Sequence, residues 1–142
     1  MKYFLGFTLL TLFFFGCKDN KEEQKEELVY EMYQPSEMTL LMREMYEHNE
    51  EIKASILQGE IPTDFPEDFL KIHSAELSSF KSRNETFQGF STLFIESEKQ
   101  IFNDSSEVDL KTRYNNTINL CISCHQTECT GPIPKIKKLL IP

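Results

Sequence analysis

The sequence predicts an all-α protein that folds as an antiparallel four-helix bundle. Apolar side chains recur at three- and four-residue spacing in successive segments, which is the period of one helix face. The chain has only 5 Gly and no Trp among 142 residues, which disfavours a turn-rich β sandwich. Short connections separate the segments, as they do between antiparallel neighbours in a bundle. These three observations fit one domain with a modest core.

The first predicted helix spans residues 37–58. Its apolar stripe runs from Met38 to Ile56, interrupted by Asn49. Ser36 is expected to cap the start of this helix, and Gly59 to end it.

Three more helices follow the first. The second is expected to be short, with these inward residues: Phe65, Phe69, Ile72 and Leu77. The Ser-rich residues 75–84 are expected to connect it to a third helix, with a continuous helix into that element as the alternative. The apolar stripe of the third helix consists of Phe87, Phe90, Phe94, Ile101 and Phe102. The fourth should begin near Glu107 after the break at 103–106, and end at Gly131 and Pro132. Residues 133–142 are then a short C-terminal extension.

The N-terminal 16 residues have the features of a signal peptide. Lys2 is followed by an almost unbroken apolar run that is too short to span a bilayer. The run ends at Gly16 and Cys17, which resembles a bacterial lipoprotein signal, in which the cysteine is acylated. The alternative is a plain signal peptide with an incidental cysteine. Residues 18–27 contain no apolar side chain, so we expect 17–35 to be a lipid-anchored flexible tether and 36–142 the folded domain.

The overall charge narrows the choice of partners. A formal net charge of -8 argues against nucleic acid, which requires a basic footprint. The four cysteines do not suggest a disulfide framework, because one ends the leader and three lie within residues 121–129.

The cysteine pair on the fourth helix carries the strongest functional signal. Cys121-Ile122-Ser123-Cys124-His125 is a C-x-x-C-H motif, typical of covalent haem attachment. On a helix, residues three and four apart share one side, so Cys121 and Cys124 are expected to form thioethers with one haem c while His125 ligates the iron. The other ring nitrogen of His125 should donate to a carbonyl or carboxylate. Zinc would need a second ligand pair, and a redox dithiol would normally open a helix.

At this point the chain resembles the class II c-type cytochromes, which include cytochrome c′. The resemblance covers roughly residues 37–126. It rests on the late C-x-x-C-H motif in the last predicted helix, and on a first helix that ends near Gly59. It implies a cytochrome c′-like bundle with one covalent haem. The tether, the short second helix and the extension from Cys129 to Pro142 depart from the family pattern.

The sixth iron ligand depends on the first helix. In the family this helix presents either a Met that binds iron or an apolar residue that leaves the position open. By its distance from Gly59, Met42 corresponds most closely to the family's ligand position, and Met45 is the alternative. Any of these methionines can instead be ordinary core packing. His48 and His73 are competing ligands.

Five other residues, on the first predicted helix and after the motif, have two interpretations each. Arg43 can pair with a haem propionate or remain solvated. Cys129 is expected to be a small buried thiol beside the haem, with a disulfide to a second chain as the alternative, which leaves dimerisation open. The lysines of the extension are either a solvated tail or a patch that steers a redox partner: Lys135, Lys137 and Lys138.

These features favour an electron carrier over an enzyme, because no nucleophile-base pair or paired catalytic carboxylates stand out. We expect a monohaem cytochrome that exchanges electrons with redox proteins. It would be exported and held in a bacterial membrane of the Gram-negative type, on the periplasmic side or outer surface. The runner-up is a five-coordinate protein that binds NO or CO, and the third candidate is a haemless interaction lipoprotein.

Overall fold

The computed structural model describes residues 33–142, and in this range the protein is all-helical, without a β strand. The predicted all-α class is therefore confirmed. The signal peptide, Cys17 and most of the predicted tether lie outside the described residues. Three long helices and three short segments follow in the order α1 (Glu37–Gln58), η2 (Glu67–His73), α2 (Glu85–Ile101), α3 (Leu110–Glu128), α4 (Ile133–Ile136) and η3 (Lys137–Leu139).

The first helix begins and ends where the sequence predicted. The Ser36 side chain accepts a hydrogen bond from the backbone N–H of Thr39, which satisfies one of the donors left free at a helix start. Gly59 closes α1 with φ of 80°, a left-handed conformation that other residues adopt only with strain.

The second predicted helix is a single 3-10 segment, η2. Two of its expected inward residues, Phe69 and Ile72, are buried, whereas Phe65 and Leu77 are half-buried. The predicted connection is also present. It ends at Asn84, whose side chain caps α2 by accepting from the N–H of Phe87 at 2.7 Å.

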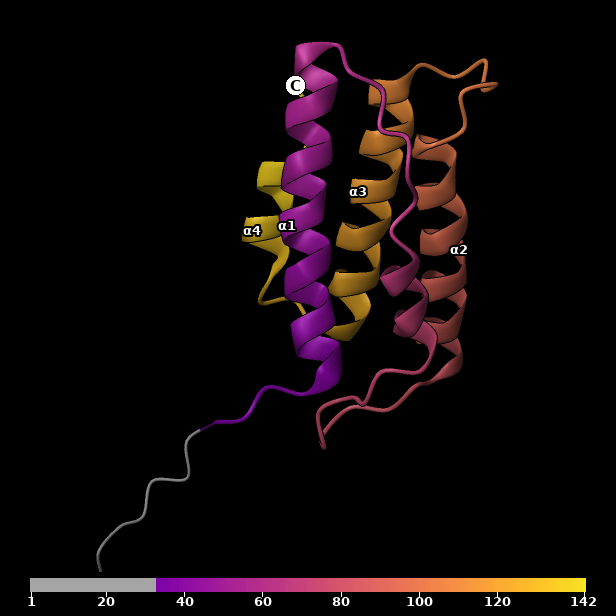
Figure 1. Ribbon diagram of the computed structural model, residues 1–142. Helices are drawn as coiled ribbons and strands as arrows, with labels where there is room; N and C mark the ends of the chain where they lie inside the picture. The colour runs from indigo at the N-terminus through magenta and orange to yellow at the C-terminus, as the bar shows by residue number, and fades with distance from the viewer. Residues whose placement is uncertain (1–32) are drawn as a thin grey trace, which may run out of the picture. The chain divides into compact units, whose positions relative to one another are not determined.

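The third long helix, α3, starts later than predicted. It begins at Leu110 rather than near Glu107, because the Asp109 side chain accepts from the N–H of Thr112 and fixes the start there. It also ends earlier than expected, at Glu128, before Gly131 and Pro132. Figure 1 shows α3 between α1 and α2, running against both of them.

The C-terminal extension is part of the core rather than a loose tail. Ile136, Leu139 and Ile141 are all buried, and the intervening lysines stay exposed. Asn115 of α3 holds Ile141 through two hydrogen bonds, from its Nδ2 to the carbonyl and from the Ile141 N–H to its Oδ1. The alternation of isoleucine and leucine with lysine lets one side of the segment pack while the other stays solvated.

Two apolar clusters form the core. The first joins α1, η2 and α2 around Phe69 and Phe94, and the second joins α1, α2, α3 and the C-terminal segment around Tyr114 and Ile118. Cys121 packs against both clusters. No helix between residues 33 and 142 has the length and apolar character needed to cross a bilayer.

Candidate functional site

One large cavity among the described residues is lined by the predicted site residues. Its volume is about 660 Å³, well within the size range of small-molecule and cofactor pockets. The lining comes from α1, the connection after η2, α2, the end of α3 and the C-terminal segment, and it includes Cys121, Cys124, His125, Met42 and Met45.

The two thiols lie on the last turns of α3. Both residues are half-buried, and burial is the main reason that the pKa of each thiol is raised, that of Cys124 to about 11. Acidic neighbours raise both pKa values further: Glu98 acts on Cys121, and Glu128 on Cys124. At neutral pH the cavity wall therefore carries two neutral thiols rather than thiolates.

The imidazole of His125 is oriented by the end of its own helix. Its Nδ1 lies 2.9 Å from the carbonyl oxygen of Cys129. A carbonyl only accepts hydrogen bonds, so this contact assigns the proton to Nδ1 and leaves the lone pair on Nε2 free. Metal-binding histidines usually donate their other ring N–H to a carbonyl or carboxylate in this way.

Three methionines of α1 line the same cavity as His125. Met38 and Met45 are buried in the first cluster, and Met42, between them, is half-buried and packs against it. Thioether sulfurs from α1 and an imidazole from α3 thus border one space.

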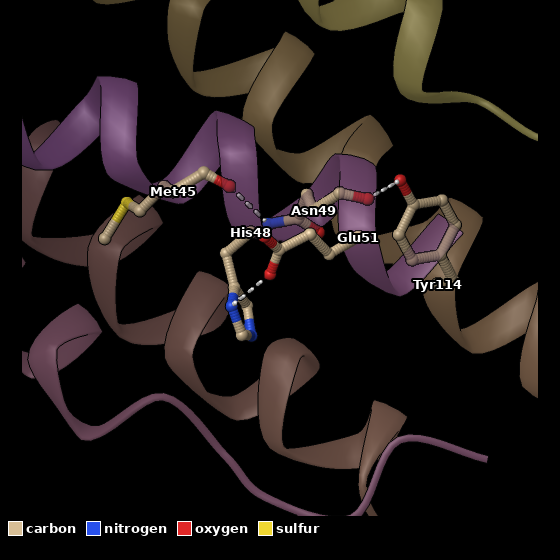
Figure 2. A network of polar contacts seen from close by, with 5 residues as sticks. All are labelled: Met45, His48, Asn49, Glu51 and Tyr114. Carbon is tan, nitrogen blue, oxygen red and sulfur yellow. Dashed lines mark hydrogen bonds and ion pairs between the residues drawn. The ribbon is translucent and has the colours of Figure 1, made fainter. Parts of the chain in front are cut away.

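A buried polar network fixes the turn of α1 that follows Met45 (Figure 2). Asn49 is 2% exposed; its Nδ2 donates to the Met45 carbonyl at 2.9 Å, and the Tyr114 hydroxyl donates to the Asn49 carbonyl, also at 2.9 Å. The backbone of α1 is thereby tied to α3 at this level.

The two competing histidines lie elsewhere. His48 packs edge-on against Phe69, with ring centres 5.4 Å apart, and its Nδ1 pairs with Glu51 at 3.7 Å. The Nδ1 of His73 lies 3.3 Å from the Ser91 hydroxyl. Within the described residues, neither histidine belongs to the cavity lining, so the structure does not bring them to His125.

The cavity lining is locally cationic in an acidic chain. Arg43, Lys81 and Lys135 line it, against one acidic residue, Glu128, whereas the whole chain has a formal charge of -8. Lys135 lies over the Tyr46 ring, 3.9 Å from its centre, and Lys81 donates to the backbone carbonyl of Glu128. This charge distribution suits a ligand with anionic groups.

Cys129 corrects one expectation. It lines the cavity but is exposed, not buried. The reason is its place at the C-cap of α3, where the backbone turns to an extended conformation after the helix ends.

Sequence reasoning missed other residues at the site. Tyr33 and Phe80 line the cavity and yet are 70% and 79% exposed, and they lie outside any periodic segment that could have signalled them. Ile136 and Leu139 also line it; their spacing on the extension was a usable signal. Glu98 does not line the cavity, but it is fully buried, and its place four residues after Phe94 and three before Ile101 marks a core position.

Among the described residues, no three His, Cys, Asp or Glu side chains converge as a set that could hold a bare metal ion. Comparison of the chain with protein-family models, curated proteins and solved structures found no match.

Proposed function

We propose that this protein is a monohaem c-type cytochrome that serves as a membrane-anchored electron carrier. One observation carries the proposal: the cavity is lined by both thiols and the imidazole of the C-x-x-C-H motif from α3, together with methionines from α1. When bound, haem would supply an iron that alternates between the ferrous and ferric states.

The cavity suits such a group in three further respects. Apolar side chains of α1 and α2 can enclose the ring, among them Met38, Phe87 and Phe94. With its proton on Nδ1, the neutral imidazole of His125 has an unprotonated Nε2, and an unprotonated ring nitrogen is what binds iron. The lining cations, Arg43 among them, offer partners for the two propionates.

Each residue then has a definite role. Cys121 and Cys124 would hold the haem through thioether bonds, and His125 would bind its iron. Met42 would be the second iron ligand, with Met45 as the alternative. The partial burial of Met42 supports this order, because its side chain is less enclosed by the apolar core than that of Met45.

The proposal includes the arrangement of the helices. The domain is an antiparallel four-helix bundle of the cytochrome c′ type, in which η2 and its flanking chain take the place of the second helix. Contacts of η2 with both α1 and α2 support this arrangement.

The location and partners complete the proposal. Acylated Cys17 anchors the exported protein on the periplasmic side or outer surface. Partners are redox proteins, which the exposed lysines 135, 137 and 138 steer electrostatically to the haem edge.

Optical spectra of the reduced protein test the electron-carrier function. The wild type should be low-spin, and only Met42→Ala should lose the low-spin spectrum, because it alone removes a ligand. Met45→Ala and Met38→Ala are the matched controls, since all three residues line the cavity. A high-spin ferrous spectrum in the wild type would contradict a six-coordinate carrier.

A second candidate is a five-coordinate haem protein that binds NO or CO. The packing of Met38 and Met45 into the apolar core supports it, because a sulfur engaged in packing does not bind iron. Fast CO binding to the reduced wild type would favour this candidate, whereas slow binding limited by methionine dissociation would favour the carrier.

A further inference from the structure

Glu98 is a carboxylic acid buried in the core without a structural partner. Its side chain is 0% exposed on α2, and neither carboxyl oxygen has a hydrogen-bond partner among residues 33–142. Burying a polar group in this way costs free energy. The haem ligands proposed above make no use of Glu98. A buried acid that no contact explains is a candidate functional group.

The position of Glu98 relates it to the proposed haem attachment. On α2, Phe94 belongs to the first core cluster and Ile101 to the second, with Glu98 between them. On α3, Cys121 packs against both clusters. Ser97, which precedes Glu98, is bonded through its hydroxyl to that of Thr117, 2.7 Å away and one helical turn before Cys121. The carboxyl thus lies at the α2–α3 interface about one helical turn from Cys121, and its charge acts on that thiol.

Few ionisable groups surround this carboxyl. From α3, the Tyr114 hydroxyl and the Cys121 thiol lie within its electrostatic reach, since the charge of Glu98 raises the pKa of both groups. From η2, His73 contacts α2 at Ser91, about two turns away from Glu98.

The other ionisable groups near α2 have partners of their own, except for one ring nitrogen. On α1, the Nδ1 of His48 pairs with Glu51, whereas its buried Nε2 has no partner among residues 33–142. Lys99 lies over the Phe65 ring, and Arg113 donates to backbone carbonyls at the end of α2. Burial is accordingly the cause that raises the pKa of Glu98, to about 8, and no opposing cation lowers it.

We propose that Glu98 is a proton-binding site coupled to the haem, so that the protein takes up a proton together with its electron. This inference rests on the proposed haem function. One electron arrives from a reduced protein partner and converts ferric to ferrous haem; the Glu98 carboxylate binds one proton from solvent and becomes a neutral acid. When the electron leaves for an oxidised partner, the proton returns to solvent.

The physical reason is the low polarity around the carboxyl. Adding an electron nearby disfavours the negative form of a buried acid, because like charges repel strongly where water is excluded. An acid that titrates near neutral pH responds to such a change by binding a proton. An exposed carboxylate would stay ionised in both states.

The test is the reduction potential of the haem-loaded full chain as a function of pH. Between the Glu98 pKa values of the oxidised and reduced states, the wild-type potential should fall as pH rises, with a slope approaching about 59 mV per pH unit for one proton per electron. Glu98→Gln should abolish this slope around neutral pH. Glu96→Gln, an exposed neighbour on the same helix, should retain it.

Redox-difference infrared spectroscopy of the wild type provides a second measurement that does not need a folded variant. At a pH near 8, reduction should produce the C=O band of a protonated carboxyl group. The absence of that band, or an equal slope in wild type and Glu98→Gln, would overturn the role of Glu98. Haem content is measured by mass on the same sample: a chain without haem overturns the proposed function itself, whereas a haem-loaded chain without proton coupling overturns only this inference.

Discussion

Replacing Glu98 by glutamine should change how the stability of the protein depends on pH. Burial raises the pKa of this carboxyl from 4.5 to about 8 in the folded chain. The native state therefore keeps the proton over a pH range in which the unfolded chain has released it. Because the native state binds more protons there, the free energy of unfolding falls as pH rises from about 4.5 to about 8.

The magnitude follows from the linkage relation. One pKa unit corresponds to about 1.4 kcal/mol, so a single carboxyl with this displacement removes roughly 2 to 3 kcal/mol of stability between about pH 5 and 7. Glutamine has nearly the same shape and does not titrate. The stability of Glu98→Gln relative to the wild type should therefore rise by that amount over the same interval and level off above about pH 8.

Chemical denaturation followed by far-UV circular dichroism, at fixed oxidation state, measures this difference. Glu96→Gln serves as the control, because Glu96 is exposed on the same helix and should leave the pH dependence unchanged. A difference between Glu98→Gln and the wild type that stays flat from pH 5 to 8, or falls, would refute the reasoning.

Two further predictions concern the C-terminal segment and the free cysteine. Leu139 is 3% exposed, so replacing it by alanine should lower the free energy of unfolding by about 2 to 5 kcal/mol. Lys138 is exposed on the same segment, so Lys138→Ala should change the stability little. Thermal denaturation compares the two variants, and equal losses of stability would mean that the segment is not part of the core. Cys129 should be alkylated by iodoacetamide in the native protein, since it is exposed. Peptide mass mapping measures the modification, and a Cys129 that reacts only after unfolding would contradict this prediction.

Much of the fold was predictable because its signals are local. The α1 caps at Ser36 and Gly59, and the apolar stripe between them, depend on neighbouring residues alone. The α3 start was placed too early because the capping contact of Asp109 with Thr112 competes with several polar residues just before it. The burial of the C-terminal segment is not predictable from its own residues, because it depends on contacts with Asn115 of α3, which lies some 26 residues before Ile141 in the sequence.

At the candidate site, too, features set by neighbouring residues were predictable and features set by tertiary packing were not. The C-x-x-C-H spacing predicts that Cys121, Cys124 and His125 share one side of a helix, and in the structure all three line the cavity. The positions of Phe80 and Lys81 were not predictable, because a loop reaches the cavity only through tertiary packing. The exposure of Cys129 was missed for a related reason: the sequence does not show that α3 ends one residue earlier.

The mass of the exported full-length protein tests the central claim most directly. The protein should be produced in a host that attaches haem to exported C-x-x-C-H motifs, then analysed intact and after proteolysis. One haem is expected, bound to the peptide that contains Cys121 and Cys124, and none on the double variant Cys121→Ala, Cys124→Ala. Unmodified thiols at both positions in the wild type would contradict it and leave a haemless lipoprotein as the remaining candidate.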